Sequence, residues 1–314
     1  MLDRSNPYFR QVELLLALMP LAGRESWFAL KGGSAINLFI RDLPRLSVDL
    51  DLTYLPIKDR KESLEEIDLS LKRIAKSVEK SLPDVNVRQA GFVEKMATKL
   101  IFSRAGEIVK METSPVLRDT IGEPEVRGVC PEIEKQFGYS EMLIVHSHDL
   151  FAGKLCAAID RQHPRDLFDV KLLLENEGIG DDLLKVFIVY LISGNRPIAE
   201  MLDPQMQPLK DVFETQFRGM ALHNVGVEEL EETRNRLVKL IQDRLSDDDR
   251  KFLISFKKGE PEWTLFSIPE AQHLPAVKWK LMNIGRMTKA KHASAVKNLE
   301  KVLFKQVKVI LENT

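Results

Sequence analysis

The spacing of apolar residues changes near the middle of the chain, and the change predicts two kinds of structure. Up to about residue 145, short runs in which apolar and polar residues alternate, as in strands, are interspersed with helical segments. From residue 147 onward, nearly every segment shows the helical repeat of apolar positions. The pattern therefore predicts an α/β (α+β) domain with a mixed sheet over residues 1–145 and an all-helical domain over residues 146–314.

The individual segments can be placed from their periodicity. Residues 61–82 give the clearest helix, because Leu64, Ile67, Leu71, Ile74 and Val78 recur at alternating spacings of three and four. Strands are expected at residues 27–31, 47–55, 85–93, 97–104, 107–116 and 141–147, and further helices at residues 8–22, 33–42, 148–162, 165–178, 181–193 and 228–246.

A turn of small residues and a pair of carboxylates mark the first half. Gly33 and Ser34 follow an expected strand and open an expected helix, where free backbone N–H groups can receive a phosphate. In the next strand, Asp49 and Asp51 alternate with apolar residues and therefore share one face. Two such carboxylates can hold Mg²⁺, which prefers oxygen ligands and is usually completed by substrate phosphates. Each motif alone is common in ordinary turns and strands, whereas their order along the chain is far more specific.

A second block of charged residues lies at the start of the helical half. Lys154 and Arg161 are seven residues apart and fall on one helix face, and Asp166 and Asp169 are one turn apart in the next helix. These cations and acids could together bind a triphosphate and orient an acceptor hydroxyl. The alternative is an Arg165–Asp169 ion pair that only joins two helices, an interaction worth tenths of a kcal/mol if exposed.

These motifs resemble those of a known enzyme superfamily. The glycine-serine turn followed by Asp-Leu-Asp is similar to the first signature of the DNA polymerase β-like nucleotidyltransferases. The block KLCAAIDRQHPRDLFDVKLL, and the stretches DRKFLISFKKGEPEWTLF and LPAVKWKLMNI, resemble the AbiEii/AbiGii toxin family and the related mycobacterial MenT toxins. The resemblance covers nearly the whole chain, and it implies the polymerase β-like fold for residues 1–145.

The resemblance also implies roles for particular residues. It makes Asp49 and Asp51 the catalytic metal-binding carboxylates, Lys154 the lysine that contacts the nucleotide, and Asp169 the acid that completes the site. Ser47, two positions before the first aspartate, matches a site residue of the MenT toxins. The superfamily often has a third carboxylate on a later strand. Glu112 is the best match for this metal ligand, although an acid in a strand is commonly just solvent-facing.

Charge and composition add expectations about location and partners. The 314-residue chain has a formal net charge of −1, two cysteines without a CxxC pattern, no long apolar run and no secretory signal pattern, so a cytoplasmic protein without a membrane segment is expected. Residues 278–314, by contrast, carry nine Lys or Arg against two acids. Within them Lys297, Lys301, Lys305 and Lys308 have helical spacing, which suits either a polyanion-binding stripe or a solvated helix face.

Three functions remain open from the sequence. The resemblance favours a toxin of a toxin-antitoxin or abortive-infection system with a cognate antitoxin, which uses Mg²⁺ and an NTP to add a nucleotide to RNA, at the tRNA 3′ end in characterised relatives. The same site could instead modify a protein hydroxyl, by nucleotide or terminal-phosphate transfer. A non-catalytic RNA- or protein-binding member is the third possibility, and the intact Asp49, Asp51, Lys154 and Asp169 argue against it.

Overall fold

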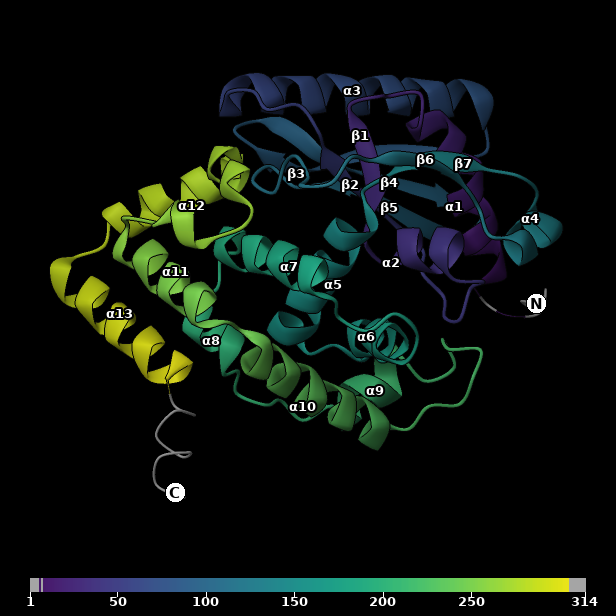
Figure 1. The fold of residues 1–314 in the computed structure, drawn as a ribbon. Helices are drawn as coiled ribbons and strands as arrows, with labels where there is room; N and C mark the ends of the chain where they lie inside the picture. The colour runs from purple at the N-terminus through teal and green to yellow at the C-terminus, as the bar shows by residue number, and fades with distance from the viewer. Residues whose placement is uncertain (1–5, 7, 305–314) are drawn as a thin grey trace. The chain divides into compact units, whose positions relative to one another are not determined.

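The computed structural model describes residue 6 and residues 8–304 and divides into two compact units. The first unit consists of residues 1–150 together with residues 219–224, and the second of residues 151–218 and 225–314. The short return segment belongs to the first unit because Leu46 N–H donates to Met220 O and Leu222 N–H donates to Pro44 O, both at 2.9 Å. Figure 1 shows the elements of both units along the chain.

The first unit is built on a mixed seven-stranded sheet with the order β3-β4-β5-β2-β1-β7-β6. Strand β2 occupies the centre, antiparallel to β1 and parallel to β5. This mixed sheet confirms the fold class expected from the sequence. The strands are β1 (Phe28–Lys31), β2 (Asp49–Tyr54), β3 (Asn86–Val93), β4 (Met96–Arg104), β5 (Glu107–Thr113), β6 (Glu125–Gly128) and β7 (Glu141–Ile144).

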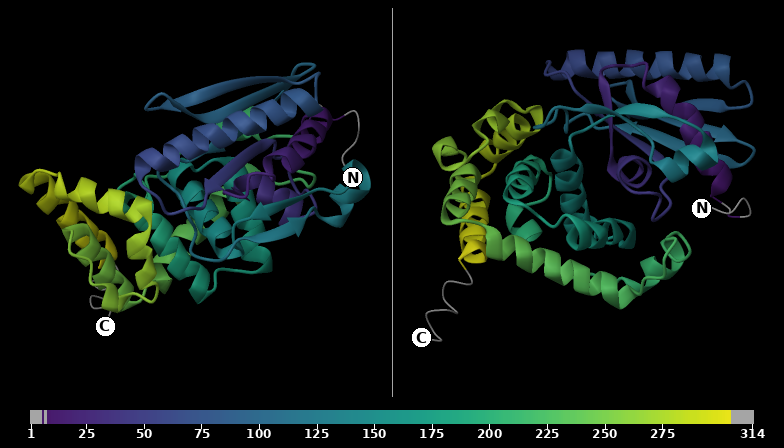
Figure 2. Two further views of the ribbon diagram at one scale, coloured as in Figure 1. Left: turned by 90° about the horizontal axis from the view of Figure 1, so that it is seen from above. Right: turned by 45° about the vertical axis from the view of Figure 1, so that its right-hand side comes forward.

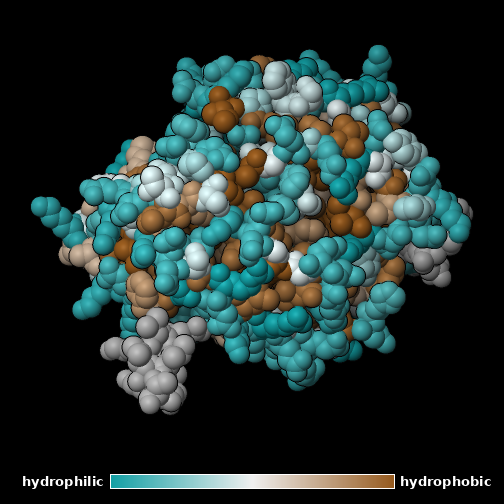
Figure 3. All heavy atoms as spheres, viewed as in Figure 1, coloured by the Kyte–Doolittle hydropathy of each residue, from teal (hydrophilic) through white to brown (hydrophobic). Residues whose placement is uncertain are grey.

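Two long helices, α1 (Phe9–Ala22) and α3 (Arg60–Ser81), cover the sheet and pack against each other (Figure 2). The apolar stripe predicted for residues 61–82 is confirmed, because all five of its residues are at most 1% exposed. Their burial in α3 against β4 removes apolar surface from water, at about 25 cal/mol per Å². On the face drawn in Figure 3, hydrophilic side chains dominate and apolar ones are scattered among them.

The second unit is helical over its described residues. Helix α7 (Asp181–Ser193) is buried on most of its length and packs against α8 (Ile198–Leu202) and α12 (Pro275–Gly285). Its other helices are α5 (Ser147–Arg161, whose first turn falls in the first unit), α6 (Pro164–Asn176), α9 (Lys210–Gln216), α10 (Val227–Arg244), α11 (Asp247–Lys258) and α13 (Lys289–Leu303), with 3₁₀ turns at Trp263–Leu265 and Pro269–His273. No helix of the described residues is both long and apolar enough to cross a bilayer.

The individually placed elements agree with the structure to within a few residues at their ends, except at residues 33–42. Strand β6 and helix α4 (Pro131–Phe137) were missed, because one is a four-residue edge strand and the other a two-turn helix that begins at a proline. Helices α8, α9, α11 and α12 were expected only as part of the all-helical second half. The helix expected at residues 33–42 is instead a four-residue α2 (Gly32–Ala35) followed by a π-helical turn (Ile36–Ile40). The Arg41 N–H donates to Ile36 O at 2.8 Å, which is the i→i+5 bond of a π-helix, a conformation common near functional sites.

Candidate active site

The turn between β1 and α2 is shaped by Gly32, which packs against a strand carboxylate. Gly32 has a φ of +76°, a region that favours glycine, and a Cβ there would lie 2.5 Å from Asp51 Oδ2. A side chain at this position would displace the carboxylate. The glycine therefore lets the backbone of the turn and the Asp51 carboxylate lie in direct contact.

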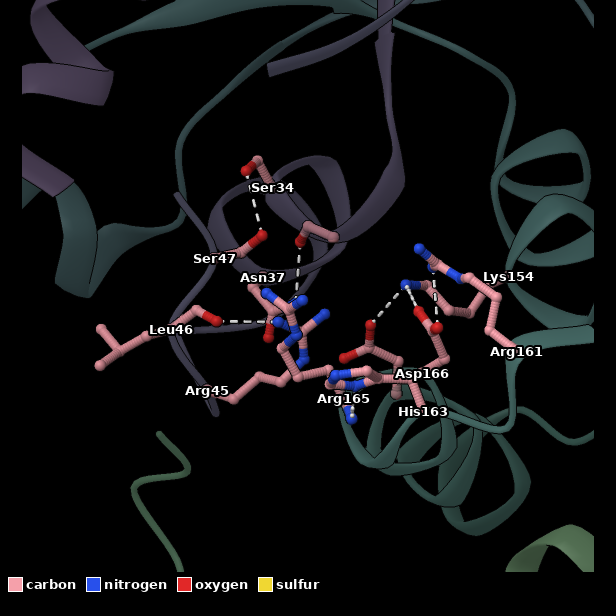
Figure 4. Close-up of polar contacts among 12 residues, drawn as sticks. Ser34, Asn37, Arg45, Leu46, Ser47, Lys154, Arg161, His163, Arg165 and Asp166 are labelled. Atoms are coloured by element: carbon pink, nitrogen blue, oxygen red, sulfur yellow. Dashed lines mark hydrogen bonds and ion pairs between the residues drawn. The ribbon is translucent and has the colours of Figure 1, made fainter. Parts of the chain in front are cut away.

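Polar side chains, among them Ser34, Ser47 and Arg45, complete a close-packed pocket around the turn (Figure 4). A Cβ on Gly33 would lie 2.7 Å from Ser47 Oγ and 2.8 Å from Arg45 Nη2. Ser34 Oγ donates to the carbonyl oxygen of Asp49 at 2.5 Å and lies 3.1 Å from Ser47 Oγ. The two serines thus tie the turn to the start of β2.

Arg45 is a cation of this pocket that the sequence reasoning missed. Its side chain belongs to a residue only 2% exposed, and Nη1 donates to Leu46 O at 2.8 Å. A β-bridge to Ala221, in the return segment, fixes its backbone. The only signal in the sequence was a lone arginine two residues before Ser47, which by itself indicates nothing. A buried guanidinium beside a glycine-rich turn adds positive charge where a phosphate would approach.

The two carboxylates of β2 lie as the alternation predicted. Leu50 and Leu52 are completely buried, whereas Asp49 and Asp51 are partly exposed on the other face. In the sheet, Asp51 is the register partner of Lys31 on β1. Burial lowers the pKa of the Lys31 amine, and the negative charge of Asp51 opposes that shift.

Glu112 is the register partner of Asp51 on the other side, in β5, so both side chains emerge on the same face of the sheet. The Glu112 carboxylate forms an ion pair with Lys99 of β4, its register partner there. Within the described residues, no three His, Cys, Asp or Glu side chains gather closely enough to hold a metal ion. Glu112 would have to leave Lys99 to join Asp49 and Asp51.

The oxygen donors of this face nevertheless fit a magnesium ion. Mg²⁺ is typically held by one or two carboxylates, with waters and substrate phosphates completing its octahedron. Asp49 and Asp51 supply the two carboxylates on one strand face, and Gly33 and Ser34 lie next to them. The donor set is therefore sufficient without Glu112, and the role of Glu112 as a ligand stays a prediction.

A second cluster lies within the helical unit and joins α5 to α6. Lys154 Nζ lies 2.9 Å from Asp166 Oδ1 and 2.9 Å from Asp169 Oδ2, and all three side chains are at most 6% exposed. Arg161 Nη2 reaches Asp166 Oδ2 at 2.8 Å while the rest of its side chain is exposed. Burial alone would raise the pKa of the Asp166 carboxyl, but Lys154 and Arg161 outweigh it and hold this pKa below its usual value. The cluster has two positive and two negative charges.

The geometry shows how Asp169 is paired. Asp169 pairs with Lys154 of the preceding helix, and its side chain is buried rather than exposed. This pairing joins α5 to α6, as the structural interpretation expected, and the assignment of the block to nucleotide binding stays a prediction. Removing one partner from a buried pair typically costs about 3–5 kcal/mol. Because breaking the cluster is this costly, we expect it to keep its geometry as a rigid unit. Arg161 carries the exposed positive charge at its edge.

The junction between α5 and α6 is held by two residues that the sequence reasoning gave no role. His163 caps α6, since its Nδ1 accepts from the Arg165 N–H at 3.1 Å, and its Nε2 lies 3.1 Å from Gln216 Oε1. An imidazole that accepts through Nδ1 must carry its proton on Nε2, so Nε2 donates to Gln216. Burial lowers the pKa of His163, which favours this neutral form.

Gln162 is the other residue, and its partners are far away in the sequence. It has a φ of +49° and is 3% exposed. Its amide donates to Gln205 O and accepts from Gln207 N–H and Arg234 Nη1, each at 2.9 Å. No local sequence signal could have revealed hydrogen bonds that span 43 to 72 residues.

Comparison with known proteins identifies the family. The pattern described as "Nucleotidyl transferase AbiEii toxin, Type IV TA system" matches residues 13–283, which is most of the chain. The chain belongs to the AbiEii nucleotidyltransferase toxin family. The resemblance seen in the sequence is thereby confirmed.

One solved structure similar to this AbiEii protein is the nucleotidyltransferase toxin MenT4 from Mycobacterium tuberculosis H37Rv. The two align with a TM-score of 0.56 at 15% identity, over 88% of this chain and 91% of MenT4. At that identity the likeness shows a common fold. No curated protein matches the sequence.

The AbiEii protein thus holds its predicted site residues in two groups. The first unit brings together Gly33, Ser34, Ser47, Asp49 and Asp51, with Glu112 on the same sheet face but engaged by Lys99. The second unit brings together Lys154, Arg161, Asp166 and Asp169. Of the predicted lysine stripe, Lys297 and Lys301 are exposed on α13, whereas Lys305 and Lys308 lie outside the described residues.

Proposed function

We propose that this AbiEii-family toxin transfers a nucleoside monophosphate from an NTP to an RNA acceptor, in a Mg²⁺-dependent reaction. The observation that carries the proposal is the close packing of the Gly32 turn on Asp51, with Asp49 on the same strand face. A phosphate-binding turn packed on paired carboxylates is the arrangement that a metal-bound triphosphate requires. Nucleotidyl transfer is the activity of the family.

The first unit would bind the triphosphate. Gly33 and Ser34 present backbone N–H groups at the start of α2, and Arg45 adds a fixed positive charge beside them. Asp49 and Asp51 would hold Mg²⁺, which supplies charge neutralisation on the phosphates and lowers the pKa of an attacking hydroxyl. Ser47 would hold the turn through Ser34.

The second unit would contribute the charged cluster on α5 and α6. Lys154 is fixed between Asp166 and Asp169, so its ammonium keeps a definite position. We assign Lys154 and Arg161 to binding the negative charge of the nucleotide. Asp169 would complete the site by fixing Lys154, and Asp166 would hold both cations in place.

The acceptor that suits this chain best is the 3′ end of a tRNA. Lys297 and Lys301 are exposed one turn apart on α13, and no ion pair of either is found within the described residues. Such a pair can follow a phosphate backbone, and unpaired RNA ends are the part of an RNA that proteins reach most readily. The type IV toxin-antitoxin family implies an antitoxin partner, and we place the reaction in the cytoplasm, where tRNA is found.

The decisive experiment measures which phosphate of the NTP is transferred and to which acceptor. The protein is incubated with total tRNA and with each NTP labelled either at the α- or at the γ-phosphate. We expect α-label in tRNA that depends on Mg²⁺ and that Asp51→Asn reduces by about 10² to 10³-fold. Label from the γ-phosphate, or label in protein, would replace this proposal with kinase or protein-modifying activity at the same site.

A further inference from the structure

A cavity of about 570 Å³ lies within the helical unit, between α8, α11 and α13 and far along the chain from the charged cluster of α5 and α6. This volume is in the range of small-molecule sites. Its wall combines apolar residues with hydrogen-bonding and charged side chains. Those used below are Ile198, Lys257, Lys291, Ser294, Ala295 and Asn298.

Lys257 of α11 is the unusual member of this wall. The residue is only 8% exposed, and within the described residues the sole polar neighbour of its Nζ is the Met287 sulfur at 3.9 Å. Burial lowers the pKa of this amine. Lys154 is buried to a similar degree but has two carboxylate partners at 2.9 Å. A buried ammonium without a counter-charge is costly, and such groups concentrate at functional sites.

The neighbourhood of Lys257 is positive. Lys280 donates to the carbonyl oxygens of Gly194, Asn195 and Arg196, so its own hydrogen bonds are made within the fold. Burial, and then the positive charge of Lys257, lower the pKa of Lys280 to about 8.

The other charged side chains of the cavity wall do not neutralise the positive charge around Lys257. Lys291 is exposed at the wall and has no ion pair within the described part of the chain. Among the described residues, the one carboxylate of the wall is Glu200, which pairs with Arg196 Nε at 3.3 Å.

We propose that this cavity binds a small phosphate monoester of mononucleotide size, as a second site apart from the transfer reaction. The phosphate would accept hydrogen bonds from Lys257 and Lys291, and Ser294 and Asn298 would bind the polar remainder. Apolar residues such as Ile198 face the ligand body. A phosphate supplies an acceptor that Lys257 does not have among the described residues, and a charge-assisted hydrogen bond in a partly dry cavity is strong.

The test uses the full chain carrying Asp51→Asn in EDTA, with AMP as the probe and calorimetry as the readout. Asp51→Asn and EDTA remove metal-dependent triphosphate binding, and any AMP still held by Gly33, Ser34 and Arg45 would not depend on Lys257. We expect AMP to bind, and Lys257→Met to weaken it about tenfold or more, the loss expected for one charge-assisted hydrogen bond. The matched control is Lys258→Met, whose side chain is 55% exposed and pairs with Glu300 at 3.9 Å, and it should bind AMP normally.

A second variant keeps the positive charge of Lys257 and fills the cavity volume. Ala295→Phe fills the cavity from α13 and should also abolish AMP binding, while the midpoint of thermal unfolding reports that the fold is intact. Lys257→Met should unfold at the same or a higher temperature, because it removes an unpaired buried charge. Equal AMP binding in all variants, or no binding at millimolar AMP, would overturn the proposal. Binding of a short single-stranded RNA that depends on Lys257, together with no binding of AMP, would also overturn it.

Discussion

Asp51 Oδ2 lies 2.5 Å from the position that a Cβ on Gly32 would occupy. The carboxylate and the turn of the proposed site are therefore packed directly against each other, and any side chain at Gly32 must displace Asp51.

Gly32→Ala should abolish nucleotide transfer. The methyl group must displace the Asp51 carboxylate, and the φ of +76° adds strain of about 1–3 kcal/mol for a non-glycine residue. The matched control is Gly106→Ala, where φ is +92° but nothing lies within 4 Å of the new Cβ. Both variants should lose stability in chemical denaturation, and only Gly32→Ala should lose transfer. Full transfer by Gly32→Ala would contradict the proposed geometry.

Asp49→Asn and Asp51→Asn should each reduce transfer by about 10² to 10³-fold, the size typical for removing one electrostatic interaction with the transition state. Glu112→Gln should reduce it much less, because Lys99 already occupies that carboxylate. Transfer measured across a Mg²⁺ titration checks both statements. A loss in Glu112→Gln as large as in Asp51→Asn would show that Glu112 leaves Lys99 to bind the metal.

Lys154→Met should destabilise the protein by about 3–5 kcal/mol, because it removes the buried ammonium that pairs with both Asp166 and Asp169 and leaves Arg161 alone beside Asp166. Lys171→Met is the control, since its ion pair with Glu175 at 2.5 Å is partly exposed and its removal should cost about 1 kcal/mol or less. Urea unfolding measures both. Equal effects of the two substitutions would mean that the buried cluster is not a rigid unit.

The stability of the fold should fall as the pH drops below about 6.5, the ordinary pKa of histidine, partly through His163. Burial lowers the pKa of His163 in the folded state, so the unfolded chain binds the extra proton first. The contribution of His163 is therefore complete above pH 6.5 and is lost as the pH falls toward the folded pKa. His163→Asn keeps a capping side chain and should flatten this part of the profile, whereas exposed His223→Asn should not.

Replacing Lys297 and Lys301 with Glu should weaken tRNA binding and make the slope of log K against log salt shallower. On a single strand, the change should be about 0.7 for each phosphate that the lysines no longer neutralise. The control is Lys76→Glu with Lys80→Glu, an equally spaced exposed pair on α3. NTP binding should remain unchanged in both double variants. An unaltered salt slope would mean that the lysines of α13 do not contact phosphates and only form a solvated helix face.

The sequence by itself determined the features that depend on local periodicity. The alternation of Asp49 and Asp51 with buried leucines, the buried stripe of α3, and the helix break at His163 could all be predicted, because each follows from backbone geometry over a few residues. The order of the motifs also pointed to the family that the match over residues 13–283 then showed.

Only the tertiary structure decided which side chains meet. Lys154 pairs with two aspartates of the next helix, and Glu112 forms an ion pair with Lys99 of a neighbouring strand. Gln162 forms hydrogen bonds with residues up to 72 positions away. The buried positions of Arg45 and of Lys257, which has no ion pair within the described residues, could not be read from the sequence either. A buried charge is stabilised or left without a partner according to what the folded chain places within about 3 Å of it, and periodicity along the sequence carries no information about that distance.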